Sequence, residues 1–272
     1  MVRDIPFYQV DAFTSQPFAG NPAAVCVLPS FPDDGVMQQI AAENNLAETA
    51  FIMRRDGGAA HYDLRWFTPT VEVEICGHAT LASAHVVFTH LETDAGAVVF
   101  ETRSGTMTVM RQADGKLCLD FPNYAPAPFP CPSGLGAAMG REPDAVLKSD
   151  KGDRDLLLVY VCAADVEALT PDLHALRQFA PFGFIATAKG EGDIDFVSRC
   201  FFPNHGIPED PVTGSAHCVS APYWAKVFGK NTLRARQVSP RSGDLWLEVA
   251  GGRVLIAGYA VEVISGTMCL PD

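Results

Sequence analysis

Apolar and polar positions alternate in a way that predicts the same order of helices and strands twice along the chain. In each stretch, apolar residues at helical spacing come first, and two runs typical of β-strands follow. Further strand-like runs come after each of these groups. The expected helices are 36–45 and 172–180, and the expected strands are 49–53, 62–67, 97–102, 105–112 and 116–121 in the first stretch and 183–187, 194–202, 235–239, 244–250 and 253–264 in the second.

Two segments within these stretches match in their order of residue types. RWFTPTVEVEICGHAT (65–80) and RCFFPNHGIPEDPVTGSA (199–216) both begin with Arg, reach an aromatic residue and Pro, and pass through a polar loop to Gly. Each then enters an apolar, Ala-rich run. We interpret this as an internal duplication, with the proline-rich segment 122–132 as the linker. The predicted halves are 1–123 and 124–272.

Each matching loop places a glycine, Gly77 or Gly214, just before a predicted helix. Glycine allows close approach of the backbone to a ligand, and the free N–H groups of a helix start attract an anion. Two such loops could bind one carboxylate-bearing molecule. The alternative, that these glycines only allow tight turns, stays open.

Composition narrows the class of protein further. The chain has 272 residues, of which 48% are hydrophobic and 19% charged, which is typical of a globular protein. The formal net charge of −12 disfavours binding to nucleic acid and to anionic membranes. Residues 1–6 lack the apolar core of a signal peptide, and no apolar run is long enough to span a bilayer. We therefore expect a cytoplasmic protein.

The eight cysteines are scattered, without a CxxC pair or the spacing of a zinc site. Most are expected to be reduced residues of the core. Cys76 and His78 are close in sequence, but no third ligand follows them at useful spacing. We therefore expect neither a metal nor a cofactor.

Five motifs resemble those of the PhzF-like (phenazine biosynthesis-like) family, which has the diaminopimelate-epimerase-like fold. The resemblance implies an α+β protein with two pseudo-symmetric halves, each a mostly antiparallel sheet wrapped around a central helix. It also implies an active site in the cleft between the halves, a final strand near 262–272 that packs back on the first half, and a homodimer. The motifs are VDAFTSQPFAGNPAAV (10–25), NLAETAFI (45–52), FTPTVEVEICGHAT (67–80), DPVTGSAH (210–217) and RSGDLWLEVAGGRVLIAGYAVEVISG (241–266).

The same resemblance implies a function and its residues. The expected activity is a cofactor-independent isomerase that moves a proton on a small cyclic or amino-acid-like carboxylate by general acid/base catalysis, with Glu48 as the proton-transfer group. The expected catalytic residues are Glu48, His78, Asp210 and Ser215, and the expected substrate-binding residues are Gly20, Asn21, Gly77, Ala79, Thr80, Thr213 and Gly214. Taken without the resemblance, Glu48 also fits a solvated turn, and His78, Asp210 and Ser215 also fit helix caps.

Two other functions stay open. The first is an amino-acid racemase or epimerase of the same fold, which uses one cysteine from each half. Cys76 stands where the first cysteine would be, but Thr213 precedes Gly214, so Cys76 is expected to be a packing residue. The second is a non-catalytic protein that binds small molecules, for which Glu48 would be unnecessary. A serine hydrolase is disfavoured because the chain has no GxSxG motif.

Overall fold

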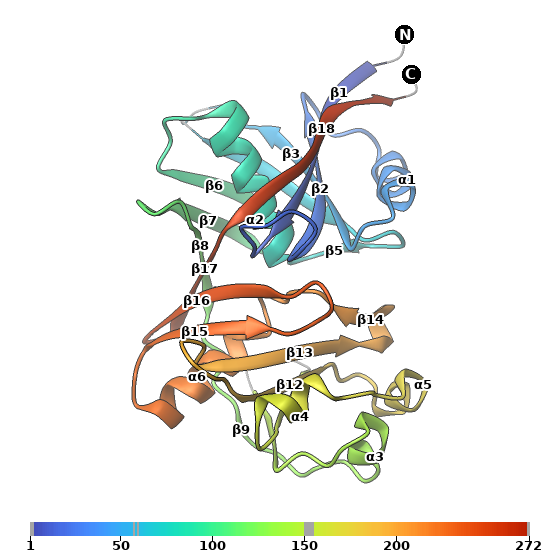
Figure 1. The fold of residues 1–272 in the computed structure, drawn as a ribbon. Coiled ribbons are helices and arrows are strands. Elements are labelled where there is room, and N and C mark those ends of the chain that lie inside the picture. Colours follow the sequence, from blue (N-terminus) through green and yellow to red (C-terminus); the bar gives the residue numbers. More distant parts are fainter. Residues whose placement is uncertain (1–2, 57, 59, 150–154, 271–272) are drawn as a thin grey trace. The chain divides into compact units, whose positions relative to one another are not determined.

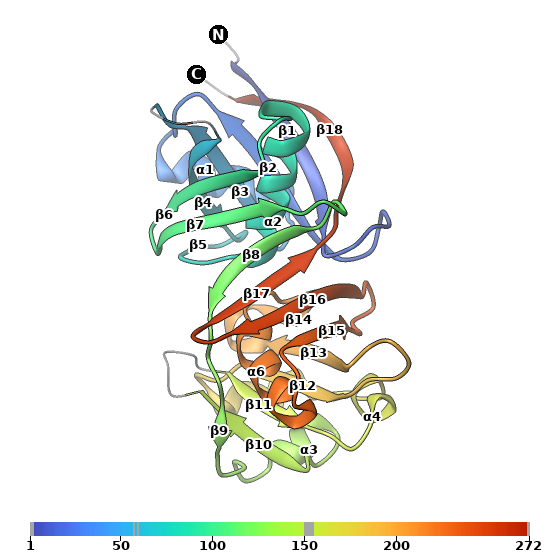
Figure 2. The same ribbon diagram turned by 90° about the vertical axis from the view of Figure 1, so that its left-hand side faces the viewer.

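The last strand of the chain pairs with the first. In the computed structural model, which describes residues 3–56, 58, 60–149 and 155–270, β18 (Ala260–Leu270) runs antiparallel to β1 (Arg3–Ala12) from end to end. The two strands lie side by side in Figures 1 and 2. Unit 1 therefore contains residues 1–120 and 257–272, and unit 2 contains 121–256. These boundaries differ from the expected division at 123/124, and residues 271–272 of the expected final strand lie outside the described residues.

Unit 1 is built around helix α2, nine of whose ten residues are buried. Its sequence, GHATLASAHV, is rich in small side chains, which allows β1, β2, β3 and β18 to pack against it. Figure 1 shows α2 among these strands. The elements after β1 are β2 (Asn21–Leu28), α1 (Asp34–Asn44), β3 (Glu48–Arg54), β4 (His61–Phe67), β5 (Glu72–Val73), α2 (Gly77–Val86), the π-helical turn η1 (Val87–Leu91), β6 (Ala97–Thr102), β7 (Gly105–Arg111) and β8 (Leu117–Pro122).

Unit 2 has a second buried helix, α6, whose described neighbours include β15 and β16. Eight of its residues are buried, among them Trp224. The elements are β9 (Ala127–Pro128), α3 (Leu135–Met139), β10 (Ala145–Lys148), β11 (Leu156–Val159), α4 (Ala163–Glu167), α5 (Leu173–Leu176), the 3-10 turns η2 (Arg177–Phe179) and η3 (Pro203–His205), β12 (Phe184–Lys189), β13 (Phe196–Phe202), β14 (Ile207–Asp210), α6 (His217–Phe228), β15 (Thr232–Gln237), β16 (Gly243–Ala250) and β17 (Arg253–Gly258).

The strands of the two units pair in the same order. In unit 1, β2–β3 and β4–β6 are parallel, whereas β3–β4, β4–β5 and β6–β7 are antiparallel. In unit 2, β11–β12 and β13–β15 are parallel, whereas β12–β13, β13–β14 and β15–β16 are antiparallel. The protein is therefore a mixed α+β fold whose sheets contain both kinds of pair. The expected superposition of two pseudo-symmetric halves stays a prediction.

An arginine–glutamate pair secures the matching loop of each unit. Arg65 donates from Nε and Nη2 to the two carboxylate oxygens of Glu72, at 2.7 Å each. Arg199 binds Glu209 in the same bidentate way, at 2.7 and 2.9 Å. Each pair joins a long strand to the short strand before the loop, β4 to β5 and β13 to β14. Paired bonds of this kind fix orientation as well as distance.

Two predicted elements differ from the structure for local reasons. The predicted helix 172–180 is reduced to α5 and the following 3-10 turn, because Ala180 precedes Pro181 and adopts an extended ψ of 143°. The predicted strand 253–264 is divided into β17 and β18. At the division, Gly258 lies so close to Phe13 that a Cβ there would be 2.5 Å from the ring. Among the described residues, no helix is long and apolar enough to cross a membrane.

Candidate active site

A buried carboxylate and a buried imidazole meet in unit 1. Glu48 is the first residue of β3, His78 is the second residue of α2, and they are only 8% and 5% exposed. Glu48 Oε2 lies 3.1 Å from His78 Nε2. Despite this distance, neither atom has an aligned hydrogen-bond partner among the described residues. Both atoms are therefore in place to interact with a further group.

The other ring nitrogen of His78 has two neighbours. The Asn21 side-chain amide lies 3.2 Å from Nδ1, and Cys76 Sγ lies 3.5 Å from it. With Nδ1 accepting from these groups, the ring proton is on Nε2, which faces Glu48. Asn21 is held here by the turn at Gly20, where φ is +64° and a Cβ would lie 2.2 Å from the carbonyl oxygen of Ala12.

The charges of this cluster are coupled. Burial by itself lowers the pKa of the His78 imidazole, but the negative charges of its neighbours outweigh burial and raise this pKa well above its usual value. Burial raises the pKa of the Cys76 thiol, and the charge of Glu48 raises it further. The protonation of the imidazole and that of the thiol are therefore coupled, and the charge of Glu48 acts on both.

Unit 2 contains a second polar network, around the end of β14. Thr213 donates its hydroxyl to Asp210 Oδ2 at 2.5 Å and its backbone N–H to Gln237 Oε1 at 2.8 Å. Gln237 in turn donates to the backbone oxygen of Asp210 at 2.7 Å. Gln237 is completely buried, and it fixes the loop that carries Asp210. Gln237 was not among the predicted site residues, and its only signal in the sequence is a polar side chain in line with the buried positions of β15.

The structure places the predicted substrate-binding residues of α2 in different surroundings. Gly77 and Ala79 are buried in the first turn of α2, on either side of His78. Thr80, in contrast, directs both its N–H and its hydroxyl to the carbonyl oxygen of Cys76, at 3.2 and 2.6 Å. Its side chain therefore stabilises the helix.

In unit 2, the hydroxyl of Thr213 is likewise occupied by Asp210, while Ser215 is half-buried in the turn after Gly214. Helix α6 begins at His217, three residues after Gly214. The expectation that the two glycine loops meet in one cleft stays a prediction.

Cys76 differs from the expectation of a simple packing residue. It is buried as expected, but its sulfur contacts His78. A possible third ligand for Cys76 and His78 comes from earlier in the chain, because β3 brings in Glu48. Ligand atoms of these three residues all lie within 4.8 Å of one another.

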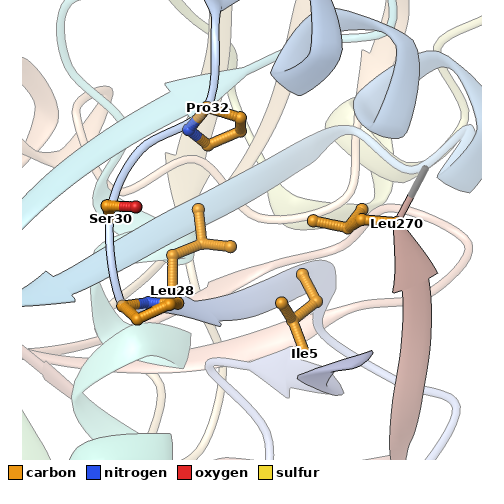
Figure 3. A pocket seen from close by; sticks show the side chains of 6 residues that line it. Ile5, Leu28, Ser30, Pro32 and Leu270 are labelled. Carbon is orange, nitrogen blue, oxygen red and sulfur yellow. The ribbon is translucent and has the colours of Figure 1, made fainter. Parts of the chain in front are cut away.

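A small apolar pocket elsewhere in unit 1 has a different character. Its volume is about 50 Å³, and its lining contains Ile5, Leu28 and Leu270, which point toward one another in Figure 3. Only Ser30 offers a polar side chain there. None of these lining side chains is an acid or a base that could transfer a proton. The cluster around Glu48 is therefore the better candidate for an active site.

Comparison with known proteins agrees with the expected family. The model of the phenazine biosynthesis-like protein family (PhzC-PhzF) matches residues 10–266. The chain belongs to this family. Among curated relatives, an "uncharacterized isomerase" of Pseudomonas aeruginosa is 48% identical over 267 residues, which cover 98% of this chain and 100% of the relative.

Solved structures identify the fold of this phenazine biosynthesis-like chain. A PhzF family protein of Enterococcus faecalis matches with a TM-score of 0.93 and 42% identity, covering 98% of this chain and 100% of the other. A hydroxyproline epimerase of Agrobacterium vitis matches with a TM-score of 0.60 and 11% identity, over 99% and 94% of the two chains. The second likeness concerns the fold alone. It agrees with the expected diaminopimelate-epimerase-like fold.

Proposed function

We propose that this chain is a cofactor-independent isomerase that moves a proton on a small carboxylate-bearing substrate, with Glu48 as the acid/base. The observation that carries the proposal is the position of Glu48 Oε2, which is buried, 3.1 Å from His78 Nε2 and without an aligned hydrogen-bond partner among the described residues. A carboxylate that only stabilised the fold would have its hydrogen bonds satisfied. The family relative named as an isomerase supports the same class of activity.

The proposed reaction needs only proton transfers. The carboxylate of Glu48 takes a proton from a substrate carbon next to an electron-withdrawing group, and the electron pair left on carbon is delocalised into that group. Glu48 then returns the proton to a different atom, which completes the isomerisation. The Nε2–H of His78 is placed to stabilise negative charge, either on Glu48 or on the substrate.

For binding, we propose that backbone N–H groups at the start of α2 donate hydrogen bonds to the substrate carboxylate. Helix starts attract anions, and Gly77 is the first residue of α2. We propose direct substrate contact for Asp210 and Ser215 also. For these two residues, Asp210→Asn and Ser215→Ala should raise KM more than they lower kcat.

A racemase that uses two thiols is less well supported. At the position of the second thiol stands Thr213, whose hydroxyl donates to Asp210 at 2.5 Å. A threonine hydroxyl is a far weaker acid than a thiol. A protein that only binds its ligand remains an outcome that the experiment distinguishes, because it would exchange no protons.

Exchange of substrate hydrogen with solvent deuterium tests the proposal. Candidate amino, hydroxy and cyclic carboxylic acids are incubated with the protein in D2O and followed by NMR. Glu48→Gln should lower the exchange rate of any responding compound by about 10²–10⁴-fold. Glu43→Gln, the same change at an exposed position of α1, is the matched control and should exchange normally. Equal rates in the two variants would remove Glu48 from the mechanism.

A further inference from the structure

Three different metal-binding groups converge at the start of α2. Cys76 Sγ, a nitrogen of His78 and a carboxylate oxygen of Glu48 lie within 4.8 Å of one another, and all three residues are buried. Two of the separations are 3.5 Å (Sγ to Nδ1) and 3.1 Å (Nε2 to Oε2). Ligand atoms around tetrahedral Zn²⁺, at bond lengths of about 2.0–2.3 Å, are separated by roughly 3.3–3.7 Å. Cys76 Sγ contacts Nδ1 and Glu48 Oε2 contacts Nε2, so an ion at Nε2 also requires the Cys76 side chain to rotate toward Glu48.

The chemistry of the three groups favours Zn²⁺ over a hard cation. Thiolate and imidazole are ligands of Zn²⁺, whereas Mg²⁺ and Ca²⁺ prefer oxygen alone. A thiolate and a carboxylate together balance the charge of a divalent ion, which matters because the site is buried. Three protein ligands also leave the fourth tetrahedral position open for water or a small anion.

A neighbouring side chain would orient the imidazole. The Asn21 side-chain nitrogen is 3.2 Å from His78 Nδ1. A metal at Nε2 leaves the ring proton on Nδ1, so the Asn21 amide would turn its oxygen toward the ring to accept that proton. A hydrogen bond from the second ring nitrogen is usual for histidine that binds zinc. Glu48 Oε2 is already next to Nε2, on the side where the metal would bind.

We propose that Glu48, Cys76 and His78 form a Zn²⁺ site whose occupation blocks the cluster. Binding breaks the S–H bond of Cys76 and the Nε2–H bond of the protonated His78 ring, forms S–Zn and N–Zn bonds and releases both protons to solvent; no electron is transferred. The bound ion occupies Glu48 and His78, so zinc is an inhibitor. The inhibition rests on the proposed function, but the binding does not.

Cobalt is the probe for this site, because Co²⁺ bound to a thiolate absorbs in the near ultraviolet. Three exposed cysteines, Cys131, Cys162 and Cys269, are first changed to Ser to remove competing thiols. The full-length protein in this background is freed of metal, titrated with Co²⁺ and then with Zn²⁺. One equivalent of Co²⁺ should produce the charge-transfer band, and Zn²⁺ should abolish it.

Further substitutions in the same background locate the ligands. Cys76→Ser should abolish the band, and Glu48→Gln should weaken Co²⁺ binding by about 10-fold or more. Cys118→Ser, which removes another buried thiol of unit 1, is the matched control and should retain the band. Circular dichroism checks that each variant is folded.

The proposal is overturned if no band forms, if the band survives in Cys76→Ser, or if Glu48→Gln binds Co²⁺ as tightly as the parent. A protein that binds Co²⁺ here but exchanges no substrate protons would contradict the proposed function alone. A protein that exchanges protons through Glu48 but shows no band would contradict the zinc site alone.

Discussion

Acid should destabilise unit 2 through one histidine, His217, the first residue of α6. This side chain is completely buried and packs beside Phe196, with ring centroids 5.8 Å apart. Its Nδ1–H donates to the backbone oxygen of Thr213 at 2.8 Å, while Nε2 is buried without a hydrogen-bond partner among the described residues. A second proton, on Nε2, would therefore place a charge and an unpaired donor in the core.

The expected loss of stability follows from the pKa values in the two states. Burial lowers the pKa of His217 to about 4 in the folded protein, despite the opposing hydrogen bond to Thr213, whereas an unfolded histidine has a pKa of about 6.5. The unfolded chain takes up the proton first as the pH falls, so stability is complete above about pH 6.5 and decreases down to about pH 4. The difference of about 2.5 pH units corresponds to a loss of about 3 kcal/mol.

Urea unfolding between pH 4 and 7.5 measures this loss. Trp224, whose ring stacks on Phe196 at 5.9 Å, reports on the region by its fluorescence. Acid also destabilises the protein by protonating carboxylates that form ion pairs. The wild type is therefore compared with His217→Gln, whose side chain at this position does not titrate. The wild type should lose about 3 kcal/mol more than this variant over the same range. His174→Gln, at an exposed position, should behave as wild type. Parallel curves for wild type and His217→Gln would refute the reasoning.

Three further predictions concern the loops and the absence of a metal requirement. Arg199→Met should lower the free energy of unfolding by about 2–3 kcal/mol, because Glu209 and three backbone carbonyls lose their partner; the exposed Arg177→Met is the control, and an equal effect of both would contradict the role of the pair. Gly20→Ala should cost more than about 1 kcal/mol in urea unfolding, because φ is +64° there; an unchanged midpoint would contradict this. Isomerase activity should survive EDTA, and a loss restored by a divalent ion would show that a metal is required.

Local sequence patterns were sufficient to place the main candidate residues on their elements. A polar residue between an apolar helix and an apolar strand put Glu48 at the start of β3, and the glycine before an Ala-rich run put His78 at the start of α2. The placements of Glu48 and His78 both depend on the residues next to them in the sequence, because these residues decide where a helix or strand begins. The family motifs supported the same residues.

Contacts between distant segments could not be derived in this way. Glu48 reaches Cys76 and His78 from β3, and Gln237 reaches the Asp210 loop from β15. Which side chains meet depends on strand pairing and register, since a shift of one residue reverses the face of every side chain. The lack of a second cysteine before Gly214 suggested that Cys76 only packs, while the fold brings its sulfur to His78.

The ranking of two variants in the solvent-deuterium assay tests the central claim most directly. With a responding carboxylate, Glu48→Gln should reduce exchange by about 10²–10⁴-fold, because glutamine cannot take up the proton at neutral pH. Cys76→Ala should retain most of the wild-type rate, because a lone thiol has no partner for a mechanism with two thiols. The reverse ranking, with exchange lost in Cys76→Ala and kept in Glu48→Gln, would contradict the account and indicate a thiol-based racemase.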